Sequence, residues 1–77
     1  MEKEIHTLMG KELSKLRIDN DMSIEELAKK SKLNKDTLYR YENGKGNSFD
    51  TLGKILSAYN SNYKLFFEKI YDNMQKS

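Results

Sequence analysis

The side chains of this sequence that are best suited to chemistry are basic and lie between residues 29 and 45. This segment holds six Lys or Arg and two Asp or Glu, a net charge of +4, whereas residues 1–28 carry −3 and residues 46–77 carry +1. Positive charge concentrated in this way is typical of a surface that binds nucleic acid. A solvated, lysine-rich helix surface explains the charge alone equally well.

Four side chains of the basic segment have the chemistry that recognises DNA bases. Arg and Lys donate to guanine O6 and N7, a carboxylate accepts from the cytosine amino group, and an aromatic ring can contact a thymine methyl group. The alternatives are ordinary exposed side chains and, for the acid, a favourable interaction with a helix dipole. We predict base contacts from Lys35, Asp36, Tyr39 and Arg40.

A second set of side chains is suited to contact the DNA backbone. Helix N-termini offer free amides and a partial positive charge to phosphates, and a polar loop after a helix can contact the same strand. Such contacts position a protein without specifying a base sequence. The predicted phosphate contacts are Ser23, Asn34, Thr37, Asn43, Lys45 and Asn47.

Two helix-start signals position these groups. Ser23 and Glu26 form a capping box, and Asn34 can cap a second helix. Apolar residues around both caps form two hydrophobic staples: Met22 with Leu27, and Leu33 with Leu38. Gly44 ends the helix that Asn34 caps, as glycine commonly does. Two short helices joined by a tight turn are a helix-turn-helix, so we predict a recognition helix over about Asn34–Asn43 in the DNA major groove.

Amphipathic helices are predicted on both sides of this pair. A first helix from near Ile5 to Ile18 has one apolar stripe, and Ser48 can cap a fourth helix. The apolar face of that fourth helix is Phe49, Leu52, Ile55, Leu56 and Tyr59. Gly53 inside it indicates close approach of a neighbouring element. We expect a compact all-α fold with its core over about residues 5–60.

The C-terminal stretch over about residues 62–74 fits a helix or a strand. Its apolar residues match the helical spacing over more positions, whereas its aromatic content suits a strand; we take a helix. In so small a chain these side chains cannot all reach one core, so they form a candidate dimer interface. Its residues are Tyr63, Phe66, Phe67, Ile70, Tyr71 and Met74.

Length and composition set the remaining bounds. Seventy-seven residues make a single domain, over residues 1–77, and the absence of cysteine excludes disulfides and thiolate chemistry. One histidine and no evident carboxylate pair leave nothing to assemble into a catalytic or metal site, so we expect neither an enzyme nor a cofactor. No apolar run is long enough for a membrane span and no signal peptide is evident. We therefore expect a cytoplasmic, nucleoid-associated protein.

Several short motifs together resemble one family. The segment from Leu8 to Glu68 resembles the Cro/C1-type (XRE-like) helix-turn-helix regulators. The matching motifs are Met9-Gly10 and Arg17 in the first helix, Glu25-Glu26-Leu27-Ala28 in the second, Glu42-Asn43-Gly44 at the end of the third, and Thr51-Leu52 in the fourth.

The resemblance implies a five-helix, lambda-repressor-like domain. It also implies an ion pair between Arg17 and Glu42 that joins the first helix to the end of the third, and base contacts from the four residues named above. Two of the departures from the family lie in the helix-turn-helix itself. Ile24 replaces the usual phosphate-binding glutamine, and Lys32 replaces the usual glycine of the turn, where it must adopt a strained φ or alter the turn.

The predicted function is regulation of transcription. One recognition helix contacts few base pairs, so we expect a homodimer on a palindromic double-stranded DNA operator, acting as a repressor. The alternative is a protein-binding module on the same fold. It would be an antitoxin that neutralises a toxin, or an antirepressor, with DNA binding only autoregulatory or lost.

Overall fold

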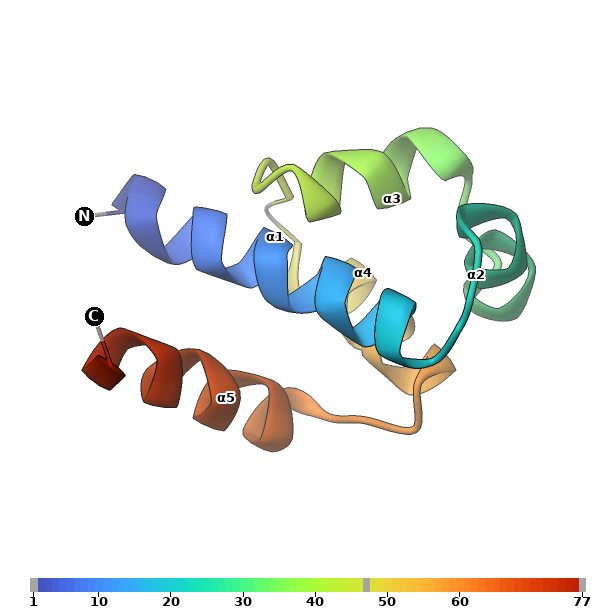
Figure 1. Cartoon of the computed structure of the whole chain (residues 1–77). Coiled ribbons are helices and arrows are strands. Elements are labelled where there is room, and N and C mark those ends of the chain that lie inside the picture. The colour runs from blue at the N-terminus through green and yellow to red at the C-terminus, as the bar shows by residue number, and fades with distance from the viewer. Residues whose placement is uncertain (1, 47, 77) are drawn as a thin grey trace.

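The computed structural model describes residues 2–46 and 48–76, which form five helices (Figure 1). These are α1 (Glu2–Asp19), α2 (Ile24–Ser31), α3 (Lys35–Glu42), α4 (Phe49–Ala58) and α5 (Tyr63–Lys76). The described residues contain no strand, so the predicted all-α, five-helix class is confirmed. The C-terminal stretch, which suited a helix or a strand, is helical.

The helices enclose one core. α1 packs against α3 and α5, α2 packs against α3 and α4, and α4 also contacts α5. In Figure 1, α1 and α5 run in opposite directions, so the two ends of the chain lie at the same end of the molecule. The side chains at the centre of the core are Leu13, Leu27, Leu38, Leu52, Ile55, Leu56, Phe66 and Ile70. Every helix thus contributes its apolar stripe to the same interior.

Packing of α5 corrects part of the predicted dimer interface. Phe66 and Ile70 are each 1% exposed and belong to the core of the single chain, because these two side chains, one helical turn apart, pack into that core. They are therefore not available to a second copy. Tyr63, Tyr71 and Met74 are exposed, and Phe67 is half-buried.

The fourth helix differs from the prediction at its first residue. Phe49, expected on the buried face of α4, is 69% exposed. Its ring instead packs against two rings of α5, with centroids 5.9 Å from Tyr63 and 6.5 Å from Phe67. Gly53 has the predicted close neighbour: a Cβ at this position would lie 2.5 Å from the Tyr63 hydroxyl oxygen.

The turn between α2 and α3 contains a residue in the left-handed conformation that is not glycine. Lys32, the residue after α2, has φ 61° and ψ 28°, which is the left-handed region. Of the two outcomes predicted for this position, a strained φ or an altered turn, the structure shows the strained φ. A residue with a Cβ tolerates this conformation at a cost of about 1–2 kcal/mol, so the rest of the fold has to maintain it.

Candidate nucleic-acid interface

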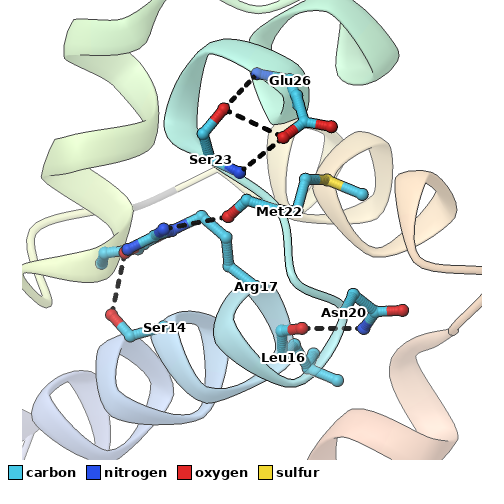
Figure 2. A network of polar contacts seen from close by, with 8 residues as sticks. Ser14, Leu16, Arg17, Asn20, Met22, Ser23 and Glu26 are labelled. Atoms are coloured by element: carbon cyan, nitrogen blue, oxygen red, sulfur yellow. Dashed lines mark hydrogen bonds and ion pairs between the residues drawn. The ribbon is translucent and has the colours of Figure 1, made fainter.

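Hydrogen bonds at the caps fix the start of α2 and the start of α3. The Ser23 hydroxyl oxygen accepts from the Glu26 amide at 3.1 Å, and the Glu26 carboxylate accepts from the Ser23 amide at 3.2 Å (Figure 2). The Asn34 side-chain oxygen accepts from the Thr37 amide at 2.8 Å. The capping box and the second cap are both as predicted, so the two helix starts are set by local contacts.

The third helix divides its side chains between the core and the solvent. Leu38 and Tyr41 are buried. The four side chains predicted to contact bases are all exposed: Lys35, Asp36, Tyr39 and Arg40. Leu38 and Tyr41 attach the helix to the core. The exposed polar face on its other side remains free to enter a groove of DNA.

Only one of these four residues has a charged neighbour among the described residues. The Lys35 ammonium lies 3.9 Å from a carboxylate oxygen of Glu25, and both side chains are more than half exposed. An exposed pair of this kind contributes little to stability. Lys35 can therefore leave Glu25 for a DNA acceptor at small cost.

An ion pair ties the recognition helix to α1. Arg17 Nε lies 2.9 Å from Glu42 Oε2, and Arg17 Nη2 donates to Glu42 Oε1 at 3.3 Å. Ser14 Oγ also donates to Glu42 Oε1, at 2.9 Å. The hydrogen bond with Glu42 raises the pKa of Arg17, and partial burial opposes that rise. The structure thus contains the pair that the resemblance implied, with Ser14 as a third member that the sequence did not reveal.

Arg17 also reaches the entrance of α2. Its Nη1 donates to the backbone carbonyl of Met22 at 3.1 Å, directly before the capping box (Figure 2). One guanidinium therefore connects α1, the end of α3 and Met22, the residue before the N-cap of α2. Because α2 and α3 are the two helices of the helix-turn-helix, Arg17 fixes their relative position.

The loop after α3 is held by the buried tyrosine of that helix. The Tyr41 hydroxyl accepts from the Ser48 amide at 2.9 Å and donates to the Ser48 carbonyl at 3.1 Å. Gly44 has φ 77°, a left-handed conformation that favours glycine. Asn43 and Lys45 are exposed on this loop. Asn47, another predicted phosphate contact, lies outside the described residues.

A polar hollow of about 180 Å³ lies between α3 and the start of α4. It is lined by Thr37, Arg40, Tyr41, Lys45, Gly46, Ser48 and Thr51. Two predicted phosphate contacts, Thr37 and Lys45, and the predicted base contact Arg40 thus share one hollow. Thr51 is an additional polar member that the sequence reading treated only as a family motif. Its place in the first turn after the loop could have identified it.

The N-terminus of α2 is less suited to phosphate than predicted. The Ser23 hydroxyl lies 3.2 Å from the Glu26 carboxylate, and a second acid, Glu25, lies in the same first turn of α2. Ile24 is buried and adds no polar group there. At α3, the cap residue Asn34 is followed by Lys35 and then by Asp36, so the two charges of that first turn cancel and Lys35 is the only cation there.

Four aromatic side chains and one methionine form a second surface, along α5 and the first residue of α4. We call this the aromatic patch: Phe49, Tyr63, Phe67, Tyr71 and Met74. The Tyr63 hydroxyl donates to the Phe49 backbone carbonyl, which joins α5 to the start of α4. Phe49 was missing from the predicted interface, because its spacing also fitted the buried face of α4.

Two further features are absent from the described residues. None of their helices has the length and apolar character needed to cross a membrane. Nor do they bring together three or more His, Cys, Asp or Glu side chains that could hold a metal ion.

Proteins of known structure share the fold of this chain. A variant of the restriction-modification controller protein C.Esp1396I superposes with a TM-score of 0.86 at 25% identity, covering 99% of this chain and 98% of that one. The clp gene regulator ClgR from Corynebacterium glutamicum gives a TM-score of 0.81 at 21% identity, over 92% of this chain and 77% of its own. Comparison with curated protein sequences gives no match.

The C.Esp1396I protein has also been solved as a tetramer in complex with its natural 35-base-pair operator. That structure gives a TM-score of 0.79 at 23% identity and covers 88% of this chain and 91% of the other. A family model, described as the Cro/C1-type HTH DNA-binding domain, matches residues 12–62, which include the capping box, the recognition helix and the Arg17–Glu42 pair. The chain therefore belongs to the family of Cro/C1-type helix-turn-helix DNA-binding domains.

Proposed function

We propose that this chain is a transcription regulator that binds a palindromic DNA operator as a homodimer and represses the promoter which that operator overlaps. The observation that carries the proposal is the polar, exposed face of α3, held in place by Leu38 and Tyr41 below and by the Arg17–Glu42 pair at its end. A short helix with this arrangement suits the major groove.

Base recognition is assigned to the exposed face of α3. Arg40 is the best donor for guanine, since its guanidinium can bond O6 and N7 together. Lys35 is a second donor, and Asp36 can accept from the amino group of cytosine. Tyr39, half exposed, can contact a thymine methyl group. Asp36 would be repelled by phosphates, so its place on α3 favours a base contact.

Phosphate contacts are assigned mainly to the hollow beside α3. Thr37, Lys45 and Thr51 line it, together with Arg40, and two of these side chains are positively charged. Asn34 and Asn43, at the two ends of α3, extend this surface so that it can contact further phosphates of the same DNA strand. Ser23 is the weakest candidate of the predicted set because Glu26 occupies its hydroxyl.

Self-association is assigned to the aromatic patch. Exposed apolar side chains gathered on one face are typical of an interface. Two copies would place two α3 helices on half-sites about one helical turn apart. The tetramer of C.Esp1396I on its operator supports self-association on DNA for a protein of the same fold.

Selection from a random DNA pool tests the proposal. We expect enrichment of a palindromic site at low salt and a loss of affinity of about 1–3 kcal/mol per half-site contact for Arg40→Ala. Lys54→Ala is the matched control: it also removes one positive charge, but from an exposed residue of α4 outside the α3 face.

Repression is tested with a reporter promoter that carries the selected site. Expression of the chain should lower the reporter signal, and Arg40→Ala should restore it. A pool without enrichment, or an Arg40→Ala variant that binds like Lys54→Ala, would refute sequence-specific binding through α3.

A further inference from the structure

A charged residue lies inside the core, on the side of α1 that faces α5. Glu12 is 2% exposed, and its carboxylate oxygen Oε2 has no hydrogen-bond partner within the described residues. Burying a carboxylate without a donor or an opposite charge is strongly unfavourable. The proposed contacts with DNA involve α3 and leave this group unexplained.

Glu12 lines a hollow of about 230 Å³ between α1, the end of α4 and α5. Part of the wall is apolar, from Leu16, Leu65 and Phe66. The remainder is polar, from Tyr59, Asn60, Ser61 and Lys69. The Tyr59 hydroxyl is a second buried polar atom without a partner in the described part of the chain. The hollow therefore suits a molecule with a donor group on a short apolar stem.

A positively charged nitrogen fits this wall better than a metal ion. Divalent cations take several carboxylate, histidine or thiolate ligands, and no group of three such residues occurs among residues 2–46 and 48–76. An ammonium carries one charge and three donors. One carboxylate and neighbouring neutral oxygens can satisfy it, while the carbon atoms next to it pack on Leu16 and Leu65.

The chain supplies one ammonium of its own at the rim. Lys69 of α5 lines the same hollow and makes no ion pair with any described residue. Its four-carbon stem is flexible. A primary alkylamine from solution has the same head group and a similar stem.

We propose that Glu12 anchors an ammonium-binding site between α1 and α5. The site takes the side chain of Lys69, or a short primary alkylamine that displaces it. Either occupant neutralises the buried carboxylate and ties α1 to α5. The site is separate from α3 and does not depend on DNA binding.

Titration of the full chain with butylammonium chloride, followed by amide NMR spectra, tests the site. Sodium chloride at equal ionic strength is the salt control. Glu12→Gln removes the charge at nearly constant volume, and Lys69→Met removes the competing ammonium. Glu68→Gln is the matched control, because it removes an exposed carboxylate next to Lys69. A thermal melt of each variant checks that it is folded.

We expect saturable shifts in α1 and α5, with a dissociation constant several-fold lower in Lys69→Met than in the parent chain. Glu12→Gln should show no saturable shift, and Glu68→Gln should behave like the parent. Equal affinity in the parent and Lys69→Met, lost in Glu12→Gln, supports the site with the free amine as its occupant. No saturation in Lys69→Met, or equal binding by Glu12→Gln, overturns the proposal.

Discussion

At the scale of single residues, Glu42 joins the fold to the candidate interface. It ends α3 and accepts hydrogen bonds from Ser14 and from two nitrogens of Arg17. Arg17 in turn holds the residue before the capping box. A change at Glu42 should therefore affect stability and DNA binding together, although Glu42 itself is not a predicted DNA contact.

Glu42→Ala should lower the free energy of unfolding by about 2–3 kcal/mol. Breaking a fully buried ion pair costs ~3–5 kcal/mol, and the loss is smaller here because the Arg17 side chain is 22% exposed. Urea unfolding followed by circular dichroism measures the change. Glu25→Ala is the control, since its pair with Lys35 is exposed and should matter little. Equal stability of the two variants would contradict this role of Glu42.

Tyr59 makes stability depend on pH in the alkaline range. Burial raises the pKa of its phenol, and the charge of Glu42 acts in the same direction. In the unfolded chain this phenol ionises near pH ~10, so above that pH the native state holds more protons. The contribution of Tyr59 is complete below about pH 10 and is lost as the pH rises towards its folded pKa.

Tyr59→Phe should therefore flatten the fall in stability above about pH 10. At neutral pH the variant should be as stable as the parent or slightly more stable, because the Tyr59 hydroxyl has no partner among the described residues. Unfolding free energies between about pH 8 and 11 provide the measurement. Tyr71→Phe removes an exposed hydroxyl and should keep the slope of the parent. The same slope in all three proteins would refute the prediction.

At the scale of elements, the turn between α2 and α3 is strained because Lys32, which has a Cβ, adopts a left-handed conformation. Lys32→Gly should stabilise the chain by about 0.5–1 kcal/mol, because glycine adopts φ 61° without a steric penalty and the gain exceeds its larger unfolded-state entropy. Thermal and urea unfolding measure the effect.

The control for the turn is Lys30→Gly, in the last turn of α2. There the backbone is helical, so glycine should destabilise, by at most about 1 kcal/mol. The two substitutions are chemically identical and two residues apart, so opposite signs isolate the backbone conformation. If Lys32→Gly destabilises the protein, the Lys32 side chain contributes more to stability than its left-handed φ costs.

Elements with local signals were predictable, and positions set by packing were not. The caps at Ser23 and Asn34 depend on neighbours three residues away, so the sequence contains all the information that they need. Phe66 and Phe49 have equally apolar side chains, yet one is in the core and the other is exposed. That difference depends on where α4 and α5 meet, which periodicity within one helix cannot determine.

Some residues of the candidate interface were likewise predictable from the sequence, and others are placed there only by packing. The exposed residues of α3 follow from helical spacing once Leu38 and Tyr41 are taken as buried. Thr51 joins them only because the Tyr41–Ser48 hydrogen bonds bring the start of α4 beside α3. The burial of Glu12 has no local signal either, because a carboxylate in the middle of α1 is normally read as a solvated charge.

At the scale of the whole molecule, the proposed function requires two copies, and the two exposed flanks of α5 are alternative surfaces for them. One flank carries the aromatic patch. The other carries Leu65, which is 49% exposed and lines the hollow over Glu12. Only one of them should control association if the aromatic patch is the dimer interface.

Phe49→Ser should reduce the dimer fraction in sedimentation equilibrium, whereas Leu65→Ser should leave it unchanged. Both substitutions remove an exposed apolar side chain, so both proteins should remain folded. In the proposed dimer one α3 contacts each half-site, so loss of the dimer should also weaken binding to a two-half-site operator far more than binding to a single half-site. If the parent chain is a monomer at all concentrations, and Phe49→Ser binds the operator normally, the aromatic patch does not join two copies on DNA. Such a patch would instead be free for a different protein, which is the arrangement that the antitoxin alternative requires.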